Sequence, residues 1–248
     1  MAKILIAGES WTTHTIHQKG FDTFTTTTYE EGVHWLKAAL ESGGHTITYI
    51  PNHRVQYDFP STREELADFD VVMLSDIGSN TLLLPDLVFM KGQKQPNKCE
   101  LIKEFVLEGG AFIMVGGYMA FSGIDAKSRY GMTAIQDVLP VTCLQVDDRV
   151  ETPEGIYPVV VDAESPVLAG VEGEWPHFLG YNKTIAREEA KMVATIGGDP
   201  FIAIGQYGKG KSAVFTSDCA PHWGPVDFIE WKHYPTFWNN LIQQVTEK

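Results

Sequence analysis

The sequence predicts an α/β protein built on a mostly parallel sheet with helices over both faces. Three observations lead to this prediction. Short apolar runs ending in glycine or aspartate alternate with segments of helical periodicity in the first half of the chain. The second half is richer in extended runs separated by glycine-containing turns. No linker, repeat or low-complexity segment interrupts the pattern, so residues 1–248 are predicted to form a single domain.

The first half is expected to contain four buried strands with helices between them. In chain order, the predicted elements are strand 3–8, helix 29–44, strand 45–51, helix 61–69, strand 70–76, helix 96–110 and strand 111–117. Thr28 and Glu31 have the spacing of a capping box at the start of the first helix. The roughly 18 residues after the first strand, including the threonine-rich stretch 23–28, are expected to form a long loop.

The second half is expected to be strand-rich. Residues 141–161 contain two extended runs on either side of a predicted turn at 153–155. Residues 192–218 contain three β runs separated by hairpin turns. Residues 234–248 are predicted to close the chain as a helix.

Composition excludes several classes of function. The 248 residues carry a net charge of −13, and the clustered Lys and Arg that a nucleic-acid partner requires are missing. No apolar run approaches the roughly 18 residues of a membrane helix, and no signal-peptide pattern occurs. Three cysteines without paired spacing suit a reducing compartment. A cytoplasmic protein is therefore predicted, with neither a nucleic-acid nor a membrane partner.

Polar and aromatic residues follow four of the predicted strands. Because parallel strands end at a shared edge of the sheet, these side chains are expected to meet there. They are Glu9, Ser10 and Trp11 after the first strand, Asp76, Ser79 and Asn80 after the third, Gly117 and Tyr118 after the fourth, and Asp218, His222 and Trp223 after the last. Carboxylates beside aromatic rings suit a small polar ligand such as a neutral polyol or sugar.

The stretch 111–123 is predicted to run from a strand through a tight turn into a helix. In hydrolases and amidotransferases such a turn carries a nucleophile within a G-x-[S/C]-x-G frame. Here Tyr118 occupies the nucleophile's position, and a tyrosine with a pKa near 10 is a poor nucleophile. Cys219 and Ser122 remain as alternative nucleophiles.

Seven stretches distributed over the chain carry a resemblance to a known family. They are residues 8–11, 19–24, 74–84, 116–124, 147–155, 179–182 and 215–224. Together they resemble the class I glutamine amidotransferase-like superfamily, in a branch of putative glutamine amidotransferases that lack the elbow cysteine. The resemblance implies a flavodoxin-like, three-layer α/β/α fold. Working members of the superfamily use an elbow cysteine with a His-Pro-Glu sequence, whereas here Tyr118 stands at the elbow and Trp223 follows His222. Standard cysteine-dependent glutaminase activity is therefore not expected. Other branches without the cysteine are linked to carbohydrate metabolism.

Two classes of function remain open. In an enzyme, His222 would act as general acid or base, Asp76 or Asp218 would orient it, and Tyr118 would donate a hydrogen bond or proton. The alternative is a non-catalytic binding module or a scaffold, in which the aromatic segment 223–238 would form an interface, including one between identical copies.

No cofactor is predicted, because the sequence lacks both a dinucleotide fingerprint and a Walker-type lysine. No metal site is predicted either. His14, His17, Glu9 and His222 offer ligand atoms but do not have the close spacing that metal sites show.

Overall fold

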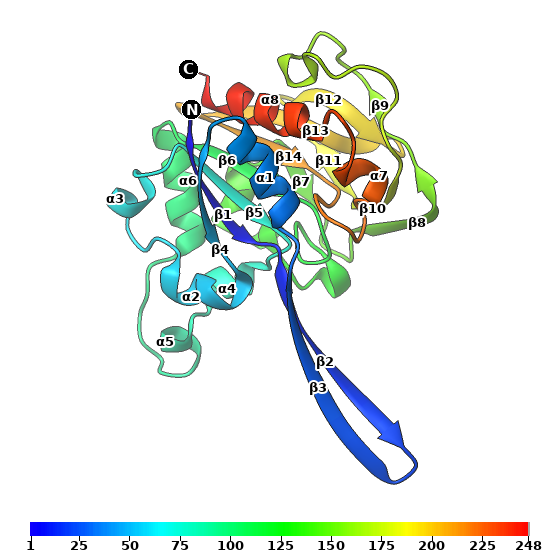
Figure 1. The fold of residues 1–248 in the computed structure, drawn as a ribbon. Helices are drawn as coiled ribbons and strands as arrows, with labels where there is room; N and C mark the ends of the chain where they lie inside the picture. The colour runs from blue at the N-terminus through cyan, green and yellow to red at the C-terminus, as the bar shows by residue number, and fades with distance from the viewer. Residues whose placement is uncertain (248) are drawn as a thin grey trace.

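An eight-stranded mixed sheet organises residues 1–247, the part of the chain that the computed structural model describes (Figure 1). The strand order is β4-β1-β5-β6-β14-β13-β12-β9. The first five strands run parallel: β4 (Thr46–Ile50), β1 (Lys3–Gly8), β5 (Val71–Ser75), β6 (Ala111–Val115) and β14 (Gly210–Phe215). The last three alternate in direction: β13 (Asp199–Tyr207), β12 (Lys191–Ile196) and β9 (Val159–Val160). The predicted α/β class is confirmed.

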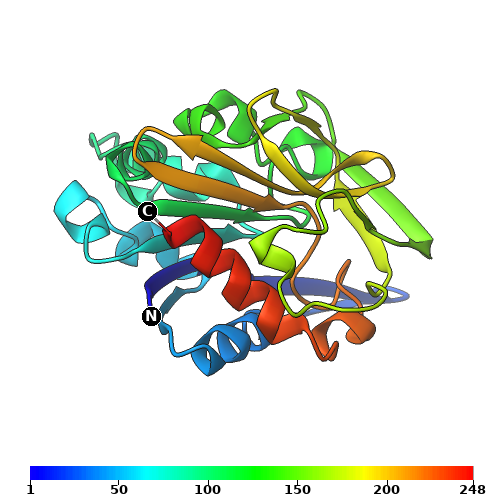
Figure 2. The ribbon, with the colours of Figure 1, turned by 90° about the horizontal axis from the view of Figure 1, so that it is seen from above.

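Helices lie on both faces of this sheet (Figure 2). Side chains alternate across β1, so that Ile4 and Ile6 join one apolar core and Leu5 and Ala7 join the other. The first core is closed by α1 (His34–Ser42) and α8 (Tyr234–Thr246), and the second by α6 (Lys98–Glu108). The central strands are buried on both faces, which explains their uninterrupted apolar sequences.

Further α-helices and strands complete the fold. They are α2 (Val55–Asp58), α3 (Arg63–Leu66), α4 (Ser79–Leu83), α5 (Asp86–Phe89), α7 (Val226–Ile229), β7 (Val141–Cys143), β8 (Arg149–Ile156), β10 (Phe178–Asn182) and β11 (Thr184–Ala186). β8 pairs with β10, and β7 pairs with β11. Among the described residues, no helix has the length and apolar character needed to cross a membrane.

The predicted loop after β1 is instead a long β-hairpin, so that expectation is wrong. Strands β2 (Ser10–Lys19) and β3 (Asp22–Glu31) pair over ten positions without a register shift. The hairpin includes the threonine-rich stretch 23–28, which is strand and not loop. Threonine is β-branched and favours extended backbone. The sequence gives no clear strand signal here, because neither face of this hairpin carries the alternating apolar residues that mark a half-buried strand.

The capping box at Thr28 and Glu31 is also wrong. Both residues belong to β3, where Glu31 pairs with Ser10 and Thr28 with Thr13. Helix α1 starts only at His34, and its N-cap residue Val33 makes no side-chain cap hydrogen bond. The backbone of both residues pairs with β2 and is therefore extended, so it cannot form the start of a helix.

The segment directly after β6, residues 116–123, forms a turn in place of the expected α-helix. The backbone has positive φ at Gly117 (147°), Phe121 (44°) and Gly123 (69°), and a continuous helix cannot pass through such residues. Carboxylates bind the N–H groups of this turn. Asp76 Oδ1 accepts from the Met119 N–H at 2.6 Å, and Asp148 accepts from the Ser122 and Gly123 N–H groups at 2.8 and 2.9 Å.

The turn predicted at 153–155 lies inside a strand. β8 continues through it, and its pairing with β10 shifts register between the Phe178–Ile156 and Gly180–Glu151 pairs. Gly155, with φ of 83°, allows this irregularity. The strands predicted within 192–218 and the closing helix are confirmed as β12, β13, β14 and α8.

Candidate functional site

The carboxyl ends of β1, β5, β6 and β14 open on one cavity of about 270 Å³. Its lining residues are Glu9, Trp11, Asp76, Tyr118, Asp218, Pro221 and His222. Six of these seven were expected at this edge from the sequence, and Pro221 is the addition. The cavity thus gathers three carboxylates, one imidazole and two aromatic rings from segments distant in the chain.

Glu9 is placed by the backbone at the end of β1. Its N–H donates to the Ser75 carbonyl at 2.8 Å, and its own φ is 49°. The buried carboxylate accepts the Ser75 hydroxyl at 2.5 Å through Oε2. Burial, together with the neighbouring Asp218 and Asp76 carboxylates, raises the pKa of Glu9 well above its ordinary value. Glu9 therefore loses its proton less readily than an ordinary glutamate.

Asp76 sits at the end of β5 with φ of 42° and faces Gly117. A Cβ at Gly117 would lie 2.8 Å from Asp76 Oδ1, so only glycine permits this close approach. Burial and the Asp218 charge raise the pKa of Asp76 to about 6. Gly117 is expected from the sequence to bind ligand, but it is not among the residues that line the cavity. Its lack of a side chain instead allows the Asp76 carboxylate to pack against the backbone.

Asp218 and His222 form the acid–base pair of the cavity. His222 Nδ1 lies 3.6 Å from Asp218 Oδ2, and 45% of the histidine side chain is exposed, whereas Asp218 is buried. The close contact with the Asp218 carboxylate raises the pKa of His222. Burial nevertheless raises the pKa of Asp218, even though His222 and two backbone N–H groups act against the shift. The imidazole is therefore the group of this pair that reaches solvent and ligand.

Tyr118 forms a wall of the cavity with its ring. Its hydroxyl donates to Glu151 Oε1 at 2.9 Å, and the Arg149 guanidinium lies 4.7 Å from the ring centroid. The ring meets His222 edge-on at a centroid distance of 4.2 Å. Burial and the Glu151 hydrogen bond raise the pKa of Tyr118. The hydroxyl is thus already held by Glu151, and the aromatic ring is the part that faces the site.

Four other residues expected at this edge do not line the cavity. Trp223 is buried beneath Tyr118 and donates from Nε1 to Glu151 Oε2 at 3.0 Å. The Ser10 hydroxyl accepts from the Asn52 N–H at 2.8 Å. Ser79 is buried at the start of α4, and Asn80 follows it on the surface.

A buried amide–carboxylate pair behind the cavity could not be predicted from the sequence. Asn182 accepts the Gly117 N–H at 3.0 Å and donates to the Gly117 carbonyl at 3.1 Å. It also donates to Asp148 Oδ1 at 2.9 Å, and that carboxylate caps Ser122 and Gly123. This network fixes the turn that presents Tyr118. Both residues lie in stretches that carry the family resemblance, which is the only signal that marked them.

The two alternative nucleophiles are held in structural contacts. The Cys219 thiol is fully buried and lies 3.7 Å from Glu9 Oε2 and 3.6 Å from Ser75 Oγ. Burial and the Glu9 charge raise its pKa well above the ordinary value, so the reactive thiolate is disfavoured. The hydroxyl of Ser122 donates to the Leu144 carbonyl oxygen.

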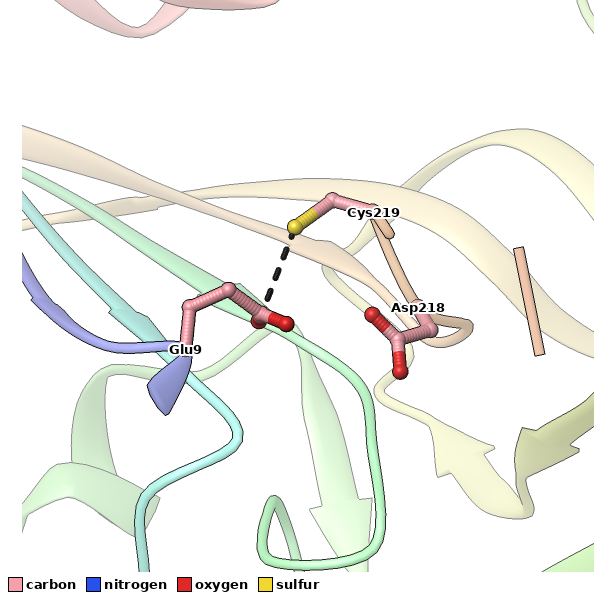
Figure 3. Close-up of side chains that lie close together, drawn as sticks. All are labelled: Glu9, Asp218 and Cys219. Carbon is pink, nitrogen blue, oxygen red and sulfur yellow. Dashed lines mark hydrogen bonds between the residues drawn. The ribbon is translucent and has the colours of Figure 1, made fainter. Parts of the chain in front are cut away.

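One set of buried side chains has the donor atoms of a metal site. The ligand atoms of Glu9, Asp218 and Cys219 lie within 4.8 Å of one another, and Figure 3 shows the three side chains converging. This set differs from the one considered on the sequence. His14 and His17 instead bond across the hairpin to Thr27 and Thr26.

The raised pKa of Asp76 leads to a stability prediction. The folded state favours the neutral carboxyl, so this contribution to stability is present below the usual value of 3.8 and is lost as the pH rises through about 6. Asp76→Asn removes the charge and keeps an acceptor for the Met119 N–H. Near pH 8 we expect the free energy of unfolding of the variant to exceed that of wild type by about 1–2 kcal/mol. The gain is limited to this range because Asp76 is partly exposed to solvent.

Near pH 4 the two proteins should be almost equally stable. Denaturant unfolding at both pH values measures the difference. Asp68→Asn, at an exposed carboxylate outside the cavity, is the control. A lower stability of Asp76→Asn near pH 8 would contradict the prediction.

Comparison with known proteins places the chain in a family. The model of the family described as "Putative glutamine amidotransferase" matches residues 3–247. The chain belongs to this family. The resemblance carried by the seven stretches is therefore confirmed, and the family match covers all four strand ends that form the cavity. A search of curated proteins gave no match.

Two solved structures of this fold are similar in sequence along their whole length. Cytoplasmic protein STM3548 from Salmonella typhimurium is 48% identical over 99% of each chain, with a TM-score of 0.96. Cytoplasmic protein STM1381 from Salmonella typhimurium LT2 is 47% identical over 99% of this chain and 100% of its own, with a TM-score of 0.95. A ThuA-like protein from Bacteroides uniformis, 11% identical over 96% of this chain and 89% of its own, has a TM-score of 0.56 and shares the fold alone.

Proposed function

We propose that the cavity binds a small neutral polyol or sugar and acts on it by general acid–base chemistry through His222. One observation carries this proposal: the ends of four strands bring three carboxylates, an imidazole and two aromatic walls to the same 270 Å³ cavity. Carboxylates accept hydrogen bonds from hydroxyl groups, while the rings of Trp11 and Tyr118 offer apolar faces to C–H groups. The acidic lining disfavours anionic ligands.

The roles of the polar residues follow from their environments. His222 is the exposed member of its pair with Asp218, and its pKa lies closer to physiological pH than that of any ordinary carboxylate. Asp218 orients the ring through Nδ1 and leaves Nε2 for the ligand. The pKa values of Asp76 and Glu9 are both raised, so each keeps a proton, and can donate a hydrogen bond, at a higher pH than an ordinary carboxyl group does.

Cysteine-dependent glutamine hydrolysis is not part of this proposal. Tyr118 occupies the elbow position, and Cys219 is a buried thiol whose pKa is raised. A cytoplasmic location, a single domain over residues 1–248 and a flavodoxin-like three-layer arrangement complete the proposal. They are supported by two relatives described as cytoplasmic proteins, by one sheet that runs from residue 3 to 215, and by helices on both of its faces.

A second candidate is a binding module without catalysis. The observation that favours it is the engagement of the Tyr118 hydroxyl by Glu151, which removes the elbow side chain from direct chemistry. This module would bind the same ligands in the same cavity and give no turnover.

A thermal-shift panel tests the proposed ligand class. It contains mono- and disaccharides, polyols, sugar acids, glutamine and Zn²⁺, the last because of the Glu9, Asp218 and Cys219 donors. A ligand at about 100 times its Kd adds about 2.7 kcal/mol of stability, which corresponds to a Tm rise of about 5–10 °C in a protein of this size.

We expect a sugar or polyol to give such a shift in wild type and not in Trp11→Ala, which removes a wall of the cavity. Tyr157→Ala, at an exposed aromatic residue outside the cavity, should keep the shift. Stabilisation by glutamine alone, or by no compound except Zn²⁺, would contradict the polyol proposal.

A further inference from the structure

The hairpin of β2 and β3 projects away from the body of the protein (Figure 1) and is hereafter called the arm, residues 10–31. Ten residues in each strand give it a length of about 33 Å. Ser10 is buried at its base, whereas Trp11 to Lys19 and the whole of β3 are largely solvent-exposed. Among residues 1–247, β2 and β3 form a two-stranded sheet with no third strand. Such isolated hairpins are at best marginally stable in water.

The central part of each strand of the arm lacks the features that normally protect free strand edges. Natural edge strands carry charged residues, proline or a bulge, which prevent pairing with other chains. Residues 12–18 and 23–29 contain no Asp, Glu, Lys, Arg or Pro, and the register of the hairpin is unbroken. Eight threonines and the exposed Ile16 and Phe24 make both strands strong β-formers. This uncharged segment stands out in a chain with a net charge of −13.

We propose that the arm is a dimerisation element, in which β2 pairs antiparallel with β2 of a second copy of this chain. Two-fold pairing joins two marginal hairpins into one four-stranded sheet, with strand order β3-β2-β2-β3. The exposed part of β2 runs from Trp11 to Lys19, so a two-fold axis at its midpoint places Thr15 opposite Thr15 of the other copy. Residues equidistant from this axis on opposite sides then face each other across the interface.

Charge distribution selects β2 over β3 as the paired edge. In the β2 pairing, Lys19 faces Trp11 of the second copy, whose indole Nε1 is bonded to Glu30 at 3.1 Å. A lysine thus meets an aromatic ring and a carboxylate, which is favourable. The corresponding pairing of β3 about Thr26 would place Asp22 opposite Glu30, and like charges directly opposite are unfavourable.

The pairing also shields the tip of each arm from solvent and brings it close to the cavity of the other copy. Phe21 at the tip is fully exposed in the single chain, at 108%. In the antiparallel arrangement each tip reaches the base of the other arm, where Trp11 lines the cavity. Lys19 of each copy therefore approaches the rim of the acidic cavity of the other.

Sedimentation velocity of the full chain tests the proposal. Wild type should sediment as a dimer. Thr15→Lys places two like charges directly opposite at the axis and should raise the dimer Kd at least about tenfold, or leave only monomer. Thr26→Lys is the matched control, because Thr26 is the hairpin partner of Thr15 on the outer strand, and this variant should remain dimeric. Both substitutions are on the exposed arm, and circular dichroism checks that the body stays folded.

Disulfide formation tests the register. Thr15→Cys should cross-link two chains under mild oxidation, since facing strand residues have Cα separations within disulfide range. Thr13→Cys should not, because Thr13 faces His17 of the other copy. The native Cys99, Cys143 and Cys219 are buried and do not compete. A monomeric wild type, a dimer that survives Thr15→Lys, dissociation by Thr26→Lys, or equal cross-linking at positions 13 and 15 would each overturn the proposal.

Discussion

Replacing His222 with alanine is expected to lower turnover of the cavity's substrate by about 10²–10⁴-fold while the protein stays folded. His222 provides the only imidazole among the lining residues and is the exposed partner of buried Asp218. The variant removes the proton-transfer group and leaves the binding walls of Trp11 and Tyr118 in place. The loss should therefore fall mainly on kcat, with a smaller effect on KM.

The measurement is kcat/KM as a function of pH, using the compound that gives the thermal shift. Because Asp218 raises the pKa of His222, one limb of the wild-type profile should titrate above the ordinary histidine value and should vanish in His222→Ala. His34→Ala, at an exposed histidine on α1, is the control. Wild-type turnover in His222→Ala would refute the assigned role. Absence of turnover in the wild type, with the shift retained in both proteins, would establish the binding-module alternative.

Gly8→Ala is expected to destabilise the protein by more than about 4 kcal/mol, which is exceptional for one methyl group. Gly8 has φ of 113°, and a Cβ built there would lie 1.8 Å from the Ser75 carbonyl oxygen. This oxygen belongs to the backbone of β5 and accepts the Glu9 N–H, so it cannot move aside without breaking the junction of β1 and β5. The same close approach places Glu9 in the cavity.

Denaturant unfolding measures the loss, and Gly20→Ala is the matched control. Gly20 also has a positive φ, 62°, but a Cβ there meets no atom within 4 Å. Its replacement should cost only the strain of the left-handed backbone, about 1–2 kcal/mol. Similar losses at the two positions would show that backbone strain, and not the contact with β5, determines the cost.

The residues at the carboxyl edge of the sheet could be predicted well from the sequence, because their placement depends on few non-local contacts. Apolar runs ending in glycine or aspartate located β1, β5 and β6, and parallel strands necessarily end at a common edge. Glu9, Asp76 and Tyr118 could therefore be assigned to one site without knowledge of the packing. His222 and Asp218 joined them because β14 pairs parallel to β6, which was only inferred from the type of fold.

The differences between expectation and structure concern residues whose surroundings come from distant parts of the chain. Trp223 follows a strand, as the cavity residues do, yet it packs beneath Tyr118 and bonds Glu151 of β8. The helix expected after β6 is replaced by a turn because Asp76 and Asp148, remote in sequence, bind its N–H groups. Local helix and strand propensities contain no information about either of these long-range contacts.

The sequence by itself determined the α/β class, the family and most of the residues that line the cavity. These depend on local apolar patterns, on motif residues and on the shared direction of parallel strands. Only the tertiary structure decided that residues 10–31 form an arm, that Cys219 is a buried thiol against Glu9, and that Asn182 anchors the turn at Gly117. Each of these depends on which backbone edges pair and which side chains lose contact with water, and both are set by contacts between segments far apart in the chain.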